Sequence, residues 1–89
     1  MEIRKKIWKE YFDDVASGRK KFELRLADFD ANEGDTLILE EWDKDKKEHT
    51  GRKIEAAITY VLKTKNVRFC QQEDVDKHGF QILQIEVKK

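Results

Sequence analysis

Apolar residues near the N-terminus recur three or four positions apart, which is the spacing of one helix face. The set is Ile7, Trp8, Tyr11, Phe12, Val15 and Ala16. The pattern predicts an amphipathic helix over residues 8–17. Ser17 and Gly18 come at its end, and Gly readily adopts the left-handed backbone with which many helices finish. We therefore expect the helix to stop at this pair.

After Lys20 the apolar residues alternate with charged ones. Phe22, Leu24 and Leu26 fall two positions apart, as in a strand with one buried face. Successive side chains on a strand point to opposite faces. We therefore expect the three apolar residues to face the core. Glu23 and Arg25 would then face outward, toward the helix.

Period-two patterns predict three further strands, over residues 36–42, 52–63 and 80–87. The strand over 52–63 is expected to bury one face formed by Ile54, Ala56, Ile58, Tyr60 and Leu62. In the last strand the apolar spacing changes between Ile82 and Ile85, which indicates a bulge or a strand buried on both faces.

The segments between these strands are polar. Asn32 and Gly34 are typical turn residues, and the run 43–51 predicts a hairpin loop longer than two residues. Residues 64–78 have no clear period and are expected to be irregular.

One helix followed by four or more strands predicts a single α+β domain over residues 1–89. So many long strands would leave costly open edges unless the sheet curls. We therefore expect a small, partly closed, mostly antiparallel β-barrel with the N-terminal helix packed beside it.

Charge adds a local feature to this picture. The 19 basic and 19 acidic residues cancel, so nothing global indicates a polyanion partner. Residues 26–50, however, hold nine acidic and three basic side chains, whereas each flanking segment holds eight basic and five acidic. A local positive surface is therefore compatible with a neutral chain.

Several classes of protein are disfavoured. No apolar run approaches the ~18–20 residues of a membrane span, and no segment resembles a signal peptide, so a cytoplasmic location is expected. Phosphate-binding Gly-rich loops and nucleophile motifs are absent from the sequence. Cys70, His49 and His78 are isolated and lack metal-ligand spacing. We expect no cofactor and no metal.

The segment 18–25 combines cations and a carboxylate near the predicted helix. Lys20, Glu23 and Arg25 would form the polar rim of a cleft between the helix and the sheet. Arg presents a planar fork for a phosphate or base edge, and Lys presents a point charge. A solvated salt-bridge ladder is the alternative explanation, worth ~0–1 kcal/mol.

The spacing Gly18-x-Lys20-x-x-Glu23-x-Arg25 resembles the GxKxxExR signature of ASCH domains, which belong to the PUA-like superfamily. The aromatic helix, the hairpin from Glu41-Trp42-Asp43 to Thr50-Gly51-Arg52, and Gly79-Phe80 are also similar. The resemblance covers most of residues 7–88. It implies a PUA-like β-barrel whose cleft binds RNA.

Carried over to this chain, the resemblance implies that Lys20, Glu23 and Arg25 are the cleft's polar residues. Arg19 and Lys21 would extend its positive rim. Single-stranded or looped RNA is the expected target, with Lys and Arg on phosphate and Glu23 accepting from a base amino group. Trp8 and Tyr11 are candidates for base stacking, although helix aromatics more often belong to the core.

Two other functions remain open. Some ASCH proteins hydrolyse the amide of acetylated cytidine nucleosides with a lysine, a threonine and a distant glutamate. Here Lys20 matches the lysine, Glu23 stands where the threonine would be, and Glu55 or Glu73 would have to supply the distant acid. The chain would then be a small amidohydrolase acting on a modified nucleoside. Alternatively, the acidic segment 28–48 would serve a non-catalytic protein-interaction module. The expected state is a monomer or a weak homodimer.

Overall fold

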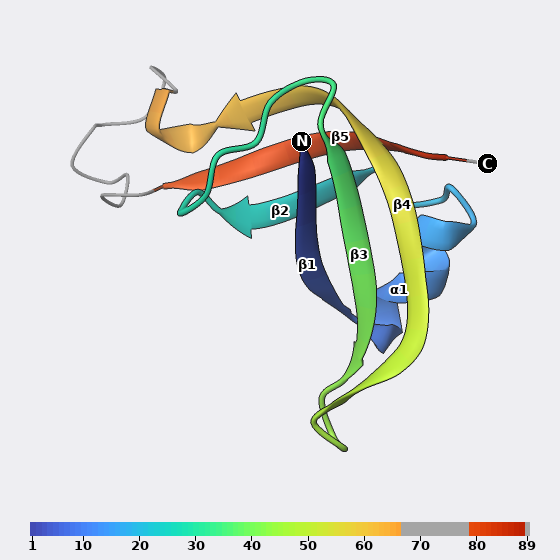
Figure 1. Ribbon diagram of the computed structural model, residues 1–89. Helices are drawn as coiled ribbons and strands as arrows, with labels where there is room; N and C mark the ends of the chain where they lie inside the picture. Colours follow the sequence, from blue (N-terminus) through green and yellow to red (C-terminus); the bar gives the residue numbers. More distant parts are fainter. Residues whose placement is uncertain (67–78, 89) are drawn as a thin grey trace.

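The computed structural model describes residues 1–66 and 79–88 (Figure 1). Its elements are β1 (Glu2–Trp8), α1 (Lys9–Ala16), β2 (Phe22–Leu26), β3 (Thr36–Asp43), β4 (Glu48–Lys63), the 3-10 turn η1 (Thr64–Asn66) and β5 (Phe80–Val87). The described strands form one sheet in the order β1-β3-β4-β5-β2. Predictions for residues 67–78, including those for Cys70, Glu73 and His78, lie outside the described residues.

The helix is confirmed within one residue at each end, but the strand before it was missed. Strand β1 pairs in parallel with β3, so that Ile3 lies opposite Leu37 and Trp8 opposite Trp42. Ile3, Lys5 and Ile7 have the alternation of a short strand. Because Ile7 and Trp8 also continue the helical spacing, both were counted in the helical pattern, and the predicted helix began at residue 8.

The helix ends where Ser17 and Gly18 predict. The backbone N–H of Gly18 donates to the carbonyl of Val15 at 3.0 Å, and Gly18 has φ +81°. This left-handed residue reverses the chain, and the N–H of Lys20 then donates to the carbonyl of Asp14 at 2.9 Å. The reversal brings Lys20 beside the helix at the start of β2.

Strand β4 is long and strongly bent, and it pairs with β3 through its first half and with β5 through its second (Figure 1). Its register with β5 shifts between Ile58 and Tyr60: Ile58 pairs with Ile85 and Tyr60 pairs with the adjacent Gln84, which leaves one extra residue on β4. The bulge was expected in β5, but the extra residue is Thr59. As a result, Tyr60 and Leu62 point outward, contrary to the prediction that they share the buried face.

Strand β5 itself alternates without interruption. Gln81, Leu83 and Ile85 are buried, whereas Phe80 and Gln84 are exposed. The altered apolar spacing between Ile82 and Ile85 therefore reflects the two faces of a regular strand. The expectation of a strand buried on both faces is wrong.

The orientation of β2 is the reverse of the prediction. Glu23 is 3% exposed, whereas Phe22 and Leu24 are 49% and 57% exposed. β2 is the edge strand beyond β5, and the interior of the sheet at this edge is a polar cleft, not apolar core. The inward position therefore suits a carboxylate that has cationic partners, and the apolar residues occupy the outer face.

The core lies between α1 and the inner face of the curled sheet. Phe12 and Val15 supply the buried side of the helix. They pack against the inward aliphatic residues Ile3, Ile7, Leu37, Leu39, Ile54, Ala56, Ile58, Leu83 and Ile85. The protein is thus a small α+β domain with one helix and a five-stranded, curled half-barrel, in which all strand pairs but β1 and β3 are antiparallel.

The two edges of the half-barrel are β1 and β2. Nη2 of Arg25, on β2, donates to the carbonyl of Lys6, on β1, at 2.7 Å. A side chain therefore joins edges that no backbone ladder connects. Across the described residues, no helix is both long and apolar enough to cross a membrane.

Candidate functional site

Glu23 is held between two cations at the seam between β1 and β2. Its Oε1 accepts from Nζ of Lys20 at 2.9 Å. Its Oε2 accepts from Nε of Arg25 at 3.0 Å and lies 2.7 Å from Nη2 of the same guanidinium. The side chains of Lys20 and Arg25 are only 22% and 23% exposed. We call these three residues the Lys20–Glu23–Arg25 cluster.

The cluster carries a net positive charge and retains hydrogen-bond donors. Nζ of Lys20 also donates to the carbonyl of Phe22 at 3.0 Å, which leaves its third N–H. Within the described residues, no acceptor is bonded to Nη1 of Arg25. Both oxygens of Glu23, in contrast, already accept from cations. The cluster therefore presents donors to a ligand and holds its own acceptor in place.

A cleft of about 430 Å³ opens beside the cluster, within the usual size range of small-ligand sites. Its lining residues are Lys6, Ile7, Trp8, Tyr11, Lys20, Phe22, Glu23, Leu24 and Arg25. The structure thus brings together Trp8, Tyr11 and the whole cluster from β1, α1 and β2.

The aromatic wall of this cleft is open to solvent. Trp8 and Tyr11 are 46% and 47% exposed, so they are not core residues. Their rings lie nearly parallel, with centroids 6.4 Å apart and planes at 17°. Nζ of Lys20 lies 4.8 Å from the ring centroid of Phe22 and 5.8 Å from that of Tyr11. A planar ligand would find rings and cations in the same cleft.

Two of the cationic residues named from the sequence lie elsewhere. The side chain of Arg19 is 83% exposed and sits 3.8 Å from a carboxylate oxygen of Asp14. Lys21 lines a different groove, on the outer side of β2, β5 and β4. Neither lines the cleft. Lys6 does line the cleft, although no pattern in the sequence had indicated it.

A second polar cluster contacts the middle of α1, at Phe12 and Asp13, and was not identified as a unit from the sequence. Glu41, which is 3% exposed, accepts from Nε and Nη2 of Arg52 at 2.8 and 2.6 Å, and also from the hydroxyl of Thr50. The guanidinium of Arg52 lies 4.3 Å from the ring centroid of Phe12. These contacts fasten the β3–β4 hairpin to α1. Only the resemblance of the hairpin sequence had drawn attention to these positions.

The ion pairs of this region change the titration of its acidic groups. The guanidinium of Arg52 holds the pKa of Glu41 below its ordinary value, with Thr50 acting the same way and burial opposing both. The same contact raises the pKa of Arg52. Backbone N–H of Lys46, followed by Lys9, lowers the pKa of Asp43. Two carboxylates of the acidic segment 28–48 are therefore engaged inside the fold.

The remaining candidates from the sequence do not enter the cleft. His49 is exposed on the hairpin, edge-on to Trp42 with centroids 5.0 Å apart. Glu55 is exposed on β4 and does not line the cleft. Within residues 1–66 and 79–88, no three His, Cys, Asp or Glu side chains are grouped to hold a metal ion.

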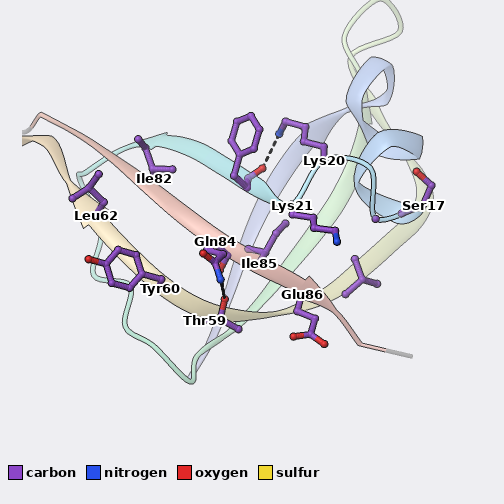
Figure 2. Close-up of a pocket in the computed structure, with 14 residues that line it drawn as sticks. Ser17, Lys20, Lys21, Thr59, Tyr60, Leu62, Ile82, Gln84, Ile85 and Glu86 are labelled. Carbon is purple, nitrogen blue, oxygen red and sulfur yellow. Dashed lines mark hydrogen bonds between the residues drawn. The ribbon is translucent and has the colours of Figure 1, made fainter.

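A larger groove, of about 960 Å³, lies on the outer side of the sheet (Figure 2). Its floor includes Tyr60, Leu62, Ile82 and Gln84, and Lys21 and Glu86 lie toward its other end. Lys20 and Phe22 border both this groove and the cleft.

The fold and cleft define a small α+β protein with a curled half-barrel and a cationic, aromatic cleft. Residues 4–85 match the family described as "Domain of unknown function (DUF3850)", and the chain belongs to that family.

Proteins similar to this chain include a curated relative and a solved structure. Over 56 residues it is 48% identical to an uncharacterized 12.9 kDa protein in the GpA 3' region of Escherichia phage P2. This stretch is 63% of the chain and 50% of the relative, so the chain spans about half the length of the curated protein that it matches. The crystal structure of hypothetical protein PH0355 has a TM-score of 0.69 at 19% identity, covering 99% of this chain and 100% of that one. That likeness concerns the fold alone.

Proposed function

We propose that this protein binds single-stranded RNA in the cleft formed by β1, α1 and β2. The observation that carries the proposal is the Lys20–Glu23–Arg25 cluster beside the half-exposed rings of Trp8 and Tyr11. Single-stranded nucleic acid is bound by cations that contact phosphates and by aromatic rings on which bases stack. An unstacked base can enter such a cleft, whereas a base inside a duplex cannot.

The hydrogen bonds within the cluster indicate which ligand atoms suit it. Lys20 and Arg25 retain donors, whereas Glu23 already accepts from both. Phosphate oxygens and base carbonyls are acceptors and would therefore be favoured over base amino groups. Glu23 acts in this proposal as a positioning residue. It orients the two cations and reduces their mutual repulsion.

The proposal includes membership of the PUA-like class. The GxKxxExR spacing of ASCH domains corresponds here to Gly18, Lys20, Glu23 and Arg25, and the last three line the cleft. The curled sheet with one helix is compatible with that class. Its proposed association with RNA agrees with the chemistry of the cluster.

Hydrolysis of a modified nucleoside is less well supported. A general base must have a carboxylate oxygen free to accept a proton from water. Both oxygens of Glu23 are instead occupied by cationic donors, and Glu55 lies outside the cleft. No observation on the described residues favours this alternative over binding.

The test is a titration of the full chain with a mixed-sequence single-stranded RNA, followed by NMR amide shifts and by fluorescence of the tryptophans. We expect shifts at residues 18–25 and at Trp8 and Tyr11. With two phosphates contacted, log Kobs should fall with log[salt] at a slope of about −1.4. A parallel titration with nucleosides, which lack phosphate, separates base stacking from phosphate binding.

Variants identify the residues responsible. Lys20→Ala and Arg25→Ala should each weaken RNA binding by about tenfold or more, because each removes a charge-assisted hydrogen bond. Lys53→Ala, at an exposed β4 lysine outside the cleft, is the matched control and should bind as the wild-type does. The proposal fails if residues 18–25 do not respond to RNA, or if affinity is the same across the salt series.

A further inference from the structure

The outward side of β2, β5 and the end of β4 is a continuous apolar surface. The strand registers place its side chains in adjacent rows. Across the three strands the rows are Leu26 and Phe80, then Leu24, Ile82 and Leu62, then Phe22, Gln84 and Tyr60. We call these eight residues the apolar outer face. Figure 2 shows Tyr60, Leu62, Ile82 and Gln84 together on the two strands.

The side chains of this face are too exposed to belong to the core of a single chain. The three aromatic residues are 49–53% exposed, and the three leucines are 40–57% exposed. At about 100 Å² for each half-exposed ring and somewhat less for each leucine, they expose on the order of 550 Å². Such an area is at the upper end of the largest apolar patch on a typical monomer, about 300–600 Å².

Among the residues that the structure describes, the charged side chains that line the groove lie at one end of this face. Lys20, Lys21 and Glu86 lie at the end nearest the helix. The eight residues of the face include no charged side chain. Besides the hydroxyl of Tyr60, their polar group is the amide of Gln84, whose Nε2 donates to the hydroxyl of Thr59 at 3.0 Å. An apolar centre with a polar border is the usual anatomy of a protein–protein interface.

We propose that this face is the interface between two copies of this chain. A two-fold dimer places the same face on both sides, and two such areas together give about 1,100 Å², just above the ~1,000 Å² that is the lower limit for a biological interface. Two sheet faces pack against each other at about 10 Å, as in a β-sandwich. The centre of the face has no charged group that would favour a particular different protein. Two copies of the same apolar face can pack against each other without one.

RNA is a poorer occupant of this face. The aliphatic side chains Leu24, Leu62 and Ile82 form its middle row, and aliphatic groups do not stack with bases as rings do. Among the described residues that line the groove, the lysines available for phosphate, Lys20 and Lys21, lie at one end. The inference does not rest on the proposed function, and among the described residues the cleft shares only Phe22 and Leu24 with the apolar outer face.

The test is the mass of the full chain by sedimentation equilibrium across a concentration series. We expect the mass to rise from 10.6 kDa to twice that value, with a dissociation constant on the order of micromolar. Tyr60→Lys and Leu62→Lys place a charge in the interface and should each give the monomer mass throughout. Both residues lie outside the cleft, so RNA binding at the cleft should be retained.

Tyr11→Lys is the matched control, because it replaces another half-exposed ring, one that lies on the helix and off the face. It should still dimerise. Circular dichroism of each variant verifies that it is folded. A wild-type chain that keeps the monomer mass at millimolar-range NMR concentrations would overturn the proposal. So would RNA-dependent amide shifts at Tyr60, Leu62 and Phe80 in a monomeric sample, which would make the face a nucleic-acid surface.

Discussion

Replacing Glu23 with Gln removes the negative charge that separates two cations. In the wild-type chain, Glu23 is 3% exposed, and its oxygens lie 2.9 Å from Nζ of Lys20 and 2.7 Å from Nη2 of Arg25. Gln has nearly the same shape, but its amide nitrogen is a donor and would face one of the cations. Glu23→Gln therefore leaves both cations without their counter-charge and sets one donor against another.

The expected cost follows from the burial of the three groups. Removing one partner of a buried ion pair costs about 3–5 kcal/mol. Because the side chains of Lys20 and Arg25 are 22% and 23% exposed, water offsets part of the loss. We therefore expect the free energy of unfolding to fall by about 2–4 kcal/mol. For a domain of this size, such a change lowers the midpoint of thermal unfolding by at least about 10 °C.

Urea unfolding followed by circular dichroism measures this free energy directly. Glu55→Gln is the matched control, because Glu55 is an exposed strand glutamate with no ion pair among the described residues. A surface substitution of this kind should change stability by no more than about 0.5 kcal/mol. If Glu23→Gln costs no more than Glu55→Gln, the cluster is a solvated salt-bridge ladder and our reasoning from its burial is wrong.

Three further outcomes are expected. Glu41 and Asp43 have lowered pKa values in the folded chain. Their contribution to stability is therefore present above the ordinary carboxyl pKa and is lost as pH falls through the folded-state values. The urea midpoint of the wild-type chain should fall from neutral to acidic pH, and that of Glu41→Gln should fall less. Gly79→Ala should lower the free energy of unfolding by about 1–3 kcal/mol, because φ is +62° and the new methyl would lie 2.8 Å from Oγ1 of Thr64. Gly51→Ala, with open space around it, should lower it less in the same urea assay. Equal losses in the two variants would contradict the clash. Arg25→Lys should lower the midpoint of thermal unfolding and weaken RNA binding, because an ammonium lacks the fork that reaches both Glu23 and the Lys6 carbonyl. An unchanged midpoint together with unchanged RNA affinity would argue against the role of Arg25 in joining β1 and β2.

The sequence predicted the elements of this fold better than their orientations. Helical spacing and the Ser17-Gly18 pair located α1 within one residue at each end. Alternation located β2, but a period of two says only that the two faces differ, not which is buried. The choice between the faces depends on the neighbours of β2. Its inner side faces a polar cleft at the sheet edge, and the buried position therefore belongs to Glu23.

The candidate site was recovered where its residues are close in sequence. Lys20, Glu23 and Arg25 lie within six positions and on one turn and strand, so spacing alone brings them together. Lys6 was missed because it enters the site through the pairing of β1 with β3, a long-range contact without a local signal. Arg19 shows the opposite error. It is adjacent to Lys20 in sequence but points away to solvent, toward Asp14.

The bulge at Thr59 divides β4 into two parts in which opposite sets of alternate residues point inward. Before it, Ile54, Ala56 and Ile58 point inward. After it the parity is inverted, so that Val61 packs against the core and Tyr60 and Leu62 are exposed. If Thr59 were instead part of a regular ladder, the alternation would continue unbroken and would turn Tyr60 and Leu62 into an already filled interior. In evolutionary terms, one extra codon at this point allows a single run of alternating apolar residues to serve the interior on one side of Thr59 and the surface on the other.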